Sequence, residues 1–251
     1  MNTTFKILPM DKAKYKLPRV SVVMPAYNAG ATIANAIMSI KNQTISDWEL
    51  IIIDDGSTDN TERIVRDFLF DTRIFYTRRN HAGLVASRND GNALARADII
   101  ALQDADDLSM PDRLEKSIAE LKYSGTDVLY HALYTNMWQE EKKCIVRDFI
   151  PAQPFSKHRL LNEQYIPGAC VFRKRCWEKK PFRMETQYAF DWMMHLDFAF
   201  SGFAYRAFNT GLYEYVRHDN SASVIFEKQG LRQKAFEIIK GIMQKEYGIQ
   251  T

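Results

Sequence analysis

Three carboxylates within four positions, at Asp104, Asp106 and Asp107, are the residues of this sequence with the clearest chemistry. They follow the largely apolar run Ile99–Gln103, which predicts a buried strand. Ser109, with a proline two positions later, predicts that a helix begins directly afterwards with the serine as its cap. Carboxylates this close repel one another unless a cation or hydrogen-bond donors compensate. The pattern therefore predicts a divalent metal ion, held by oxygen ligands, at the end of a strand.

The segments before this strand alternate between two kinds of pattern. Apolar runs predict strands at 20–24, 50–53 and 74–76, and helical spacing or helix-compatible composition predicts helices at 33–40 and 83–96. Asp59 and Glu62 have the spacing of a capping box for a further helix. This alternation predicts βαβ units, and hence an α/β fold with a mainly parallel sheet flanked by helices.

Polar loops follow three of the predicted strands, at the edge where parallel sheets bind ligands. They are Pro25–Asn28, Asp54–Asp55 and Asp104–Asp107. We expect Tyr27 to expose its ring for stacking and Asp54 to form an Asx turn, which leaves Asp55 for a ligand. Neither G-x-G-x-x-G nor the P-loop pattern occurs, so the usual backbone cradles for phosphate are absent from the sequence. Because a metal ion can bridge carboxylate and diphosphate, this edge is predicted to bind a nucleotide diphosphate.

The pattern changes beyond a helix that is predicted to end near Gly125. Strands are predicted at 128–137 and 144–150, as an antiparallel pair, and at 169–172, 203–208 and 212–216. A helix is predicted over 186–201, with Asp191 in its first turns and His195 one turn later, and an amphipathic helix follows near the C-terminus. We divide the chain, within one overall domain, into a basic arm (1–18), a half that binds the nucleotide (19–125), an elaborated half for the second substrate (126–225) and a C-terminal helix (226–251).

Composition is that of an ordinary globular protein: 46% of the 251 residues are hydrophobic, 26% are charged, and the net charge is +3. That charge is too small to indicate nucleic acid as a partner. The first 19 residues carry a net +4, for which we expect a solvated tail, with peripheral contact at the inner face of a membrane as the alternative. No apolar run is long enough to span a membrane and no secretory signal is present, so we expect a cytoplasmic protein. The three cysteines match neither a zinc site nor a disulfide framework.

Four ordered motifs resemble those of the family 2 glycosyltransferases of GT-A fold. They are 20–28, 54–59, Arg88-Asn89-x-Gly91 and 104–107. The resemblance implies an inverting hexosyl- or N-acetylhexosaminyltransferase that moves a sugar from a nucleotide diphosphate sugar, usually a UDP-sugar, with Mn2+ or Mg2+ as cofactor. It implies a saccharide, lipid-linked or glycoconjugate acceptor, in the synthesis of cell-surface polysaccharide or glycoconjugates.

The resemblance also implies roles for particular residues. Tyr27 would lie against the base, Asp55 would accept a hydrogen bond from the uracil ring, and Asp104 would face the ribose. Asp106 would ligate the metal, and His218 lies in a loop whose histidine reaches the metal or diphosphate in some members. The full nucleotide-binding set that the resemblance implies is Pro25, Tyr27, Asp55, Arg88, Asp104 and Asp106.

Asp191 is the catalytic base that the resemblance implies, because 188–192 matches a pair of acids at a helix start, with Phe190 in place of the first acid. A carboxylate near a helix N-terminus is stabilised by the helix dipole, so we also expect a lowered pKa for Asp191. Two other functions stay open, a metal-dependent sugar nucleotidyltransferase and a non-catalytic nucleotide-binding protein. Four rings are candidates for stacking on the acceptor, with core packing as the alternative: Trp138, Phe155, Trp177 and Trp192.

Overall fold

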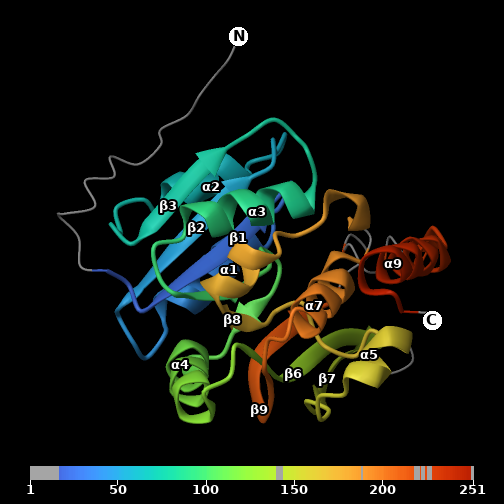
Figure 1. Ribbon diagram of the computed structural model, residues 1–251. Helices are drawn as coiled ribbons and strands as arrows, with labels where there is room; N and C mark the ends of the chain where they lie inside the picture. Colours follow the sequence, from blue (N-terminus) through green and yellow to red (C-terminus); the bar gives the residue numbers. More distant parts are fainter. Residues whose placement is uncertain are drawn as a thin grey trace.

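The computed structural model describes residues 17–139, 144–187, 189–217, 221, 224 and 228–249. Its strands are β1 (Val20–Ala26), β2 (Trp48–Asp54), β3 (Ile74–Arg78), β4 (Ile99–Leu102), β5 (Leu108–Ser109), β6 (Val128–Gln139), β7 (Cys144–Ile150), β8 (Val171–Arg173) and β9 (Tyr205–Val216). Its α-helices are α1 (Ile33–Lys41), α2 (Thr61–Arg66), α3 (Leu84–Leu94), α4 (Arg113–Ser124), α5 (Lys157–Asn162), α6 (Lys174–Lys179), α7 (Phe190–Phe200) and α9 (Leu231–Tyr247). The strands form one mixed sheet in the order β3-β2-β1-β4-β8-β6-β9-β5, with β7 paired to β6 (Figure 1).

The first half of the sheet is parallel, as the alternation of apolar runs and helices predicts. β1 lies between β2 and β4, with Val23 opposite both Ile51 and Leu102. Alternate residues of a strand point to opposite faces, so Val22 packs into one hydrophobic cluster with α1 while Val23 packs into a second with α3 and α7. Helix α3 lies so close to the sheet that a Cβ on Gly91 would meet Val23 Cγ1 at 2.4 Å. Both faces are therefore covered, which explains why these strands are apolar throughout.

The second half of the sheet is mixed. β8 pairs antiparallel with both β4 and β6, and the predicted antiparallel pair is confirmed as β6 and β7. The prediction of two strands at 203–208 and 212–216 is wrong, because β9 is a single strand through both segments. Its pairing with β6 shifts register at Ala132, and this irregularity accommodates the extra residues around Gly211 without ending the strand.

Two predicted helix starts are also wrong. Ser109 does not cap α4, whose N-cap is Asp112; it lies in β5, and its Oγ donates to Gln103 Oε1 over 2.7 Å. Asp59 does not begin a capping box, because Asn60 is the N-cap of α2 and lacks a side-chain capping bond. The Asp59 carboxylate instead accepts from Thr61 Oγ1, 2.5 Å away. Ser109 thus finds its partner outside the helix end, whereas Asp59 still holds the start of α2, because it also accepts from the Thr61 N–H at 2.9 Å.

The helix predicted over 186–201 begins later than expected. Residues 184–186 form a short 3-10 helix, and α7 starts only at Phe190, which places Asp191 in its first turn. α5, α7 and α9 gather at one end of the molecule, away from α2 and β3 (Figure 1). This end combines α5 and α7, from the predicted 126–225 half, with α9, from the predicted C-terminal helix segment.

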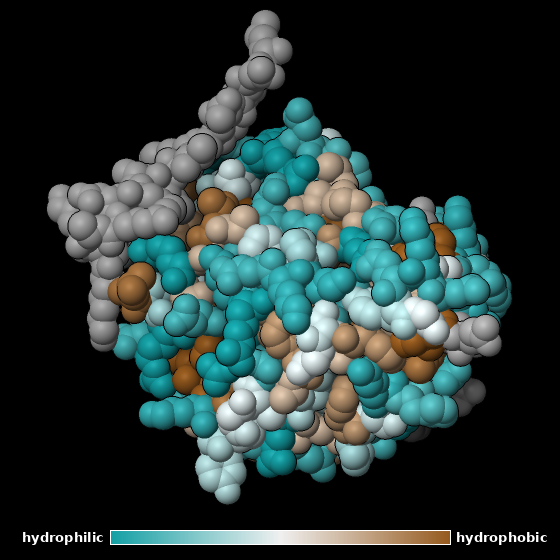
Figure 2. Space-filling view, viewed as in Figure 1, coloured by the Kyte–Doolittle hydropathy of each residue, from teal (hydrophilic) through white to brown (hydrophobic). Residues whose placement is uncertain are grey.

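The face shown in Figure 2 is largely hydrophilic, with hydrophobic side chains in separate places. Phe70 and Tyr123 are the most exposed of the large hydrophobic side chains described, at 91% and 85%. They lie on different elements, and single exposed hydrophobic residues are normal on a protein surface. No helix in the described part of the chain combines the length and the apolar character needed to cross a lipid bilayer.

Candidate functional site

The loop after β2 separates two neighbouring aspartates by role. Asp54 Oδ1 accepts from the backbone N–H of Ser57 at 2.7 Å, and its Oδ2 accepts from the Tyr76 hydroxyl at 2.6 Å. Asp54 thus holds this turn as predicted, although it accepts from the third residue along the chain and not from the second, as an Asx turn does. Both of its oxygens already have a partner. Asp55 is left to face the neighbouring loop after β3.

Asp55 is held by the backbone of that neighbouring loop. Its side chain is 4% exposed, and its oxygens accept from the N–H groups of Ala82 (3.0 Å) and Gly83 (2.8 Å). His81 Nδ1 lies 2.8 Å from Asp55 Oδ2. Gly83 has a φ of 96°, a conformation that favours glycine. A carboxylate has about four lone-pair positions, so these three contacts leave one on Oδ1 for a ligand, with Arg79 Nε 3.6 Å from the same oxygen.

An aromatic pair stands beside this carboxylate. Tyr27 is 50% exposed, as predicted, and its ring centroid lies 4.4 Å from that of His81 with 31° between the planes. Asn28 has a positive φ of 49°, which sets the turn that follows Tyr27. The sequence analysis missed His81, although its place in the loop after β3, at the same sheet edge as Asp55, is a signal that could have identified it. Pro25, which was expected in the loop after the strand, is instead buried within β1, because the strand continues to Ala26.

The three carboxylates of the acidic loop after β4 differ in how deeply they are buried. Asp107 is 1% exposed and accepts from the Val216 N–H at 2.8 Å, so it holds the loop against β9. Burial raises the pKa of Asp107 well above its ordinary value, and the charges of Asp104 and Asp106 raise it further. Asp104 and Asp106 are both half-buried, and the Asp104 N–H donates to the Tyr213 hydroxyl at 3.0 Å.

The composition of this loop fits a metal ion that takes most of its ligands from a substrate. Within the described ranges, no three His, Cys, Asp or Glu side chains are grouped to hold a metal ion alone. Mg2+ usually binds one or two carboxylates and completes its shell with water and substrate phosphates. Asp106, with Asp104 beside it, offers that kind of donor set, and the three neighbouring carboxylates concentrate negative charge that a cation would offset. The second predicted ligand, His218, lies outside the described residues.

Arg88 connects the acidic loop to the second half of the chain. It projects from α3, is 1% exposed, and its Nη2 donates to Asp104 Oδ1. On the other side, the guanidinium carbon lies 4.4 Å from the ring centroid of Phe190, the residue that stands where the family motif has an acid. Arg88 Nε and Nη1 have no hydrogen-bond partner among the described residues. Arg88 is therefore an interior cation between the acidic loop and the start of α7, a burial that sequence reasoning did not foresee.

Asp191 lies next to this cation, at the start of α7. Its Oδ1 accepts from the Trp192 N–H at 3.0 Å, and its Oδ2 accepts from Gln164 Nε2 at 2.6 Å. The expectation of a lowered pKa is wrong: burial raises the pKa of Asp191, and the nearby Arg88 charge and the Trp192 N–H offset only part of that effect. A Cβ on Gly168 would meet Asp191 Cβ at 3.1 Å, so the loop before β8 closes tightly around the carboxylate. Gln164 is a second residue that the sequence analysis missed.

His195, one turn further along α7, has a structural role. It is fully buried, with Nε2 3.2 Å from the Pro167 carbonyl oxygen and Nδ1 3.2 Å from the Tyr205 hydroxyl. Burial lowers its pKa to about 4, so the imidazole is neutral at physiological pH. Of the candidate stacking rings, Phe155 packs on Tyr205 at 4.3 Å between ring centroids, which is a core contact.

Comparison with known proteins agrees with this geometry. The family model described as Glycosyl transferase family 2 matches residues 21–212. One relative is Escherichia coli UDP-Glc:alpha-D-GlcNAc-diphosphoundecaprenol beta-1,3-glucosyltransferase WfgD, which is 34% identical to this chain over 144 residues. The matched segment covers 57% of this chain and 55% of WfgD. The chain spans between 30% and 55% of the length of WfgD and two other curated relatives that it matches.

Two solved structures show a similar fold at low identity. S. aureus TarS 1–349 in complex with UDP-GlcNAc has a TM-score of 0.68 at 16% identity, over 92% of this chain and 73% of that one. Mannosyltransferase PcManGT from Pyrobaculum calidifontis, in complex with GDP-Man and Mn2+, has a TM-score of 0.63 at 18% identity, over 89% of this chain and 64% of that one. The sheet matches that of GT-A glycosyltransferases. Because the family model covers most of the chain, this protein belongs to glycosyl transferase family 2.

Proposed function

We propose that this chain catalyses the inverting transfer of a sugar from a UDP-sugar to a hydroxyl group of a saccharide or lipid-linked acceptor. One observation carries the proposal: Asp104 of the acidic loop and Phe190, next to Asp191, contact the same buried guanidinium of Arg88. The carboxylates assigned to the donor and to the acceptor thus belong to one site. The name of WfgD gives UDP-Glc as its donor, and TarS is complexed with UDP-GlcNAc, which supports uridine as the nucleoside.

The base of the nucleotide is proposed to lie in the cluster of Tyr27, His81 and Asp55. The exposed Tyr27 ring offers a face for stacking, and base stacking on an aromatic ring contributes about 1–3 kcal/mol. Asp55 is fixed by two backbone N–H groups and accepts the N–H of a uracil ring with a remaining lone pair. The Asp55 side chain is therefore oriented before the nucleotide binds, which lowers the entropy cost of fixing it on binding.

The diphosphate is proposed to lie over the acidic loop. Asp106, with Asp104 beside it, would hold Mn2+ or Mg2+, and His218 remains a proposed further ligand. When bound, such an ion neutralises charge that develops on the departing diphosphate. Arg88 supplies a fixed positive charge beneath Asp104 and keeps that carboxylate in place. Asp107 holds the loop from below through the Val216 N–H.

Asp191 is proposed to act as the general base. The acceptor hydroxyl loses its proton to a carboxylate oxygen of Asp191 as its own oxygen forms a bond to the anomeric carbon. The bond from that carbon to the diphosphate oxygen breaks on the opposite face, and the electron pair leaves with UDP, so the anomeric configuration inverts. The raised pKa of Asp191 brings its basicity closer to neutral pH, where a general base is most effective.

A donor screen tests the proposal directly. UDP-Glc, UDP-Gal, UDP-GlcNAc and UDP-GalNAc are each incubated with the chain and Mn2+, and UDP release is measured. We expect release from at least one donor. For Asp106→Asn, we expect the Mn2+ concentration that gives half-maximal release to rise at least about tenfold. Release of pyrophosphate from UTP would indicate a nucleotidyltransferase instead. UDP binding without release from any donor would indicate a non-catalytic nucleotide-binding protein.

A further inference from the structure

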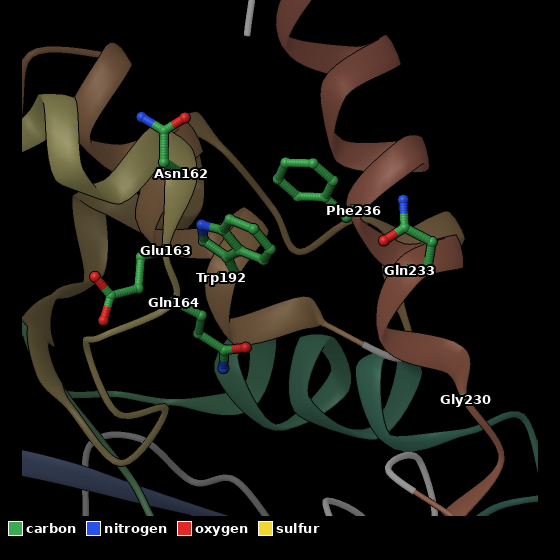
Figure 3. A pocket seen from close by; sticks show the side chains of 7 residues that line it. All are labelled: Asn162, Glu163, Gln164, Trp192, Gly230, Gln233 and Phe236. Atoms are coloured by element: carbon green, nitrogen blue, oxygen red, sulfur yellow. The ribbon is translucent and has the colours of Figure 1, made fainter.

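A cavity of about 380 Å3 lies between α5, α7 and α9, at the end of the molecule that carries Asp191 (Figure 3). Its volume is at the lower end of the range for ligand pockets, about 300–1,000 Å3. The side chains that determine its chemistry are Asn162, Glu163, Gln164, Trp192, Gln233 and Phe236. None of them belongs to the nucleotide-binding set or is the proposed base, so the cavity is separate from the donor side of the site.

The floor of the cavity is aromatic and rigid. The rings of Trp192 and Phe236 face each other, with centroids 5.6 Å apart and 20° between their planes (Figure 3). Trp192 Nε1 donates to the Leu160 carbonyl oxygen at 2.6 Å, which fixes the indole in place. Trp192 is 5% exposed, and Phe236 is half-buried with Lys240 Nζ 4.4 Å from its ring centroid, so only part of the phenyl ring is open to a ligand. An aromatic face suits the C–H groups of a sugar ring.

The rim of the cavity is made mostly of amides. Asn162, Gln164 and Gln233 are exposed, and each amide both donates and accepts hydrogen bonds, as a sugar hydroxyl also does. The one charged side chain in the described lining, Glu163, is ion-paired with Arg159 at 2.8 Å. Lys240 Nζ, 4.4 Å from the Phe236 ring centroid, adds a positive charge beside the lining, and the carboxylate of Asp191, which is bonded to Gln164, adds a negative one. These charges nearly balance, so the cavity favours a neutral ligand over a phosphate or a uronate, which the Asp191 carboxylate would repel.

Gln164 joins the cavity to the proposed base. It lines the cavity, and its Nε2 donates to Asp191 Oδ2 at 2.6 Å. That bond uses one lone pair of the oxygen and leaves another for an incoming hydroxyl. A sugar in the cavity would thus lie beside the carboxylate that accepts its proton, with Gln164 holding the carboxylate in orientation.

We propose that this cavity binds a neutral saccharide unit of the acceptor, and that Gln164 is the positioning residue that aligns Asp191 with it. The inference rests on the proposed function, because it assigns the cavity to the acceptor of that reaction. The inference limits the acceptors to molecules whose terminal sugar is uncharged.

Binding of simple sugars tests the cavity. Methyl glycosides of glucose, galactose, N-acetylglucosamine and glucuronic acid are titrated into the full chain with UDP and Mn2+, and followed by saturation-transfer NMR. Gln233→Trp fills the cavity from an exposed position, and Lys234→Trp is the matched control on the next residue of α9. We expect a neutral glycoside to bind more tightly than the glucuronide, and to bind about tenfold more weakly to Gln233→Trp than to the control, since two or more hydrogen bonds are lost. Equal binding to both variants, preference for the glucuronide, or no binding of any neutral glycoside would overturn the proposal.

Two further readouts separate this inference from the proposed function. A UDP titration of the same samples reports the donor side: no UDP binding would contradict the proposed function, whereas UDP binding without glycoside binding would contradict only the cavity inference. The role of Gln164 is tested by Gln164→Glu, which places a second carboxylate beside Asp191 and should raise its pKa. We expect the acid limb of the pH profile for UDP release to move to higher pH in Gln164→Glu. An unmoved limb would show that Gln164 does not position the base.

Discussion

Replacing Asp191 with asparagine keeps the size of the side chain and removes the charge that accepts the acceptor proton. The amide oxygen can still accept from the Trp192 N–H, which now lies 3.0 Å from Oδ1, and the Gln164 amide, which now donates to Oδ2, can turn so that its oxygen accepts from the new amide N–H. The start of α7 should therefore keep its geometry. General-base catalysis contributes about 10²- to 10⁴-fold to a rate. We therefore expect UDP release in the presence of acceptor to fall at least about 100-fold in Asp191→Asn.

The same substitution is expected to leave the fold as stable or more stable. Burial raises the pKa of Asp191 in the folded state, so ionisation of this side chain opposes folding once the pH exceeds the ordinary aspartate value of about 3.9. The penalty is complete above the folded-state pKa, and it amounts to about 1.4 kcal/mol for each pH unit that separates the folded and unfolded pKa values. Asparagine carries no such penalty. The stability gain should therefore be present at neutral pH and disappear as the pH falls toward the ordinary aspartate value.

The assay combines UDP release with urea unfolding, each measured across pH. In the parent protein, UDP release should fall on the acid side as Asp191 takes up a proton, at a pH above the ordinary aspartate pKa. Asp67→Asn, an exposed aspartate at the end of α2, is the matched control and should match the parent protein in both measurements. An Asp191→Asn protein that is folded and keeps its turnover within about threefold of the parent would refute the role of Asp191. A marked loss of stability at neutral pH would refute the account of its pKa.

Three further predictions concern the nucleotide loop, the helix-to-sheet contact and the buried histidines. Tyr27→Ala should weaken UDP binding about tenfold, as expected for a lost stacking contact, while Tyr27→Phe binds normally; equal affinities in calorimetry would exclude stacking. Gly91→Ala should lower the free energy of unfolding by about 1–3 kcal/mol, because the added methyl meets a β1 side chain at 2.4 Å. Gly241→Ala, in a helix with open space around it, should raise that free energy by about 0.5–1 kcal/mol, and urea melts that rank the two variants otherwise would contradict both. Burial lowers the pKa of His195 to about 4 and that of His131 to about 3, so the stability that each neutral ring contributes should be complete above pH 6.5 and fall as the pH drops toward 4, by about 1.4 kcal/mol per pH unit. Because the raised pKa values of Asp107 and Asp191 act in the opposite direction, the measurement is the difference in urea stability between the parent and His195→Gln at each pH; a difference that does not change with pH would contradict burial of His195 as a neutral ring.

The parts of this protein that the sequence determined by itself are those that depend on neighbouring residues. The apolar runs predicted β1, β2 and β4 because a strand buried on both faces needs apolar residues throughout. The same local logic predicted that Asp54 forms a turn and that Tyr27 is exposed, since both follow directly from their place after a strand. The order of motifs along the chain then predicted the family.

Only the tertiary structure decided how distant segments modify these residues. The lowered pKa expected for Asp191 follows from its helix alone, whereas the loop at Gly168 buries the carboxylate and the pKa is raised instead. His81 and Gln164 were missed because each acts through a partner more than 25 positions away in the chain, Asp55 and Asp191. The desolvation of an ionisable side chain depends on every segment packed around it, and a long-range hydrogen bond forms only when folding brings two distant segments together. A linear pattern carries neither, so it located the carboxylates but not the environment that sets their chemistry.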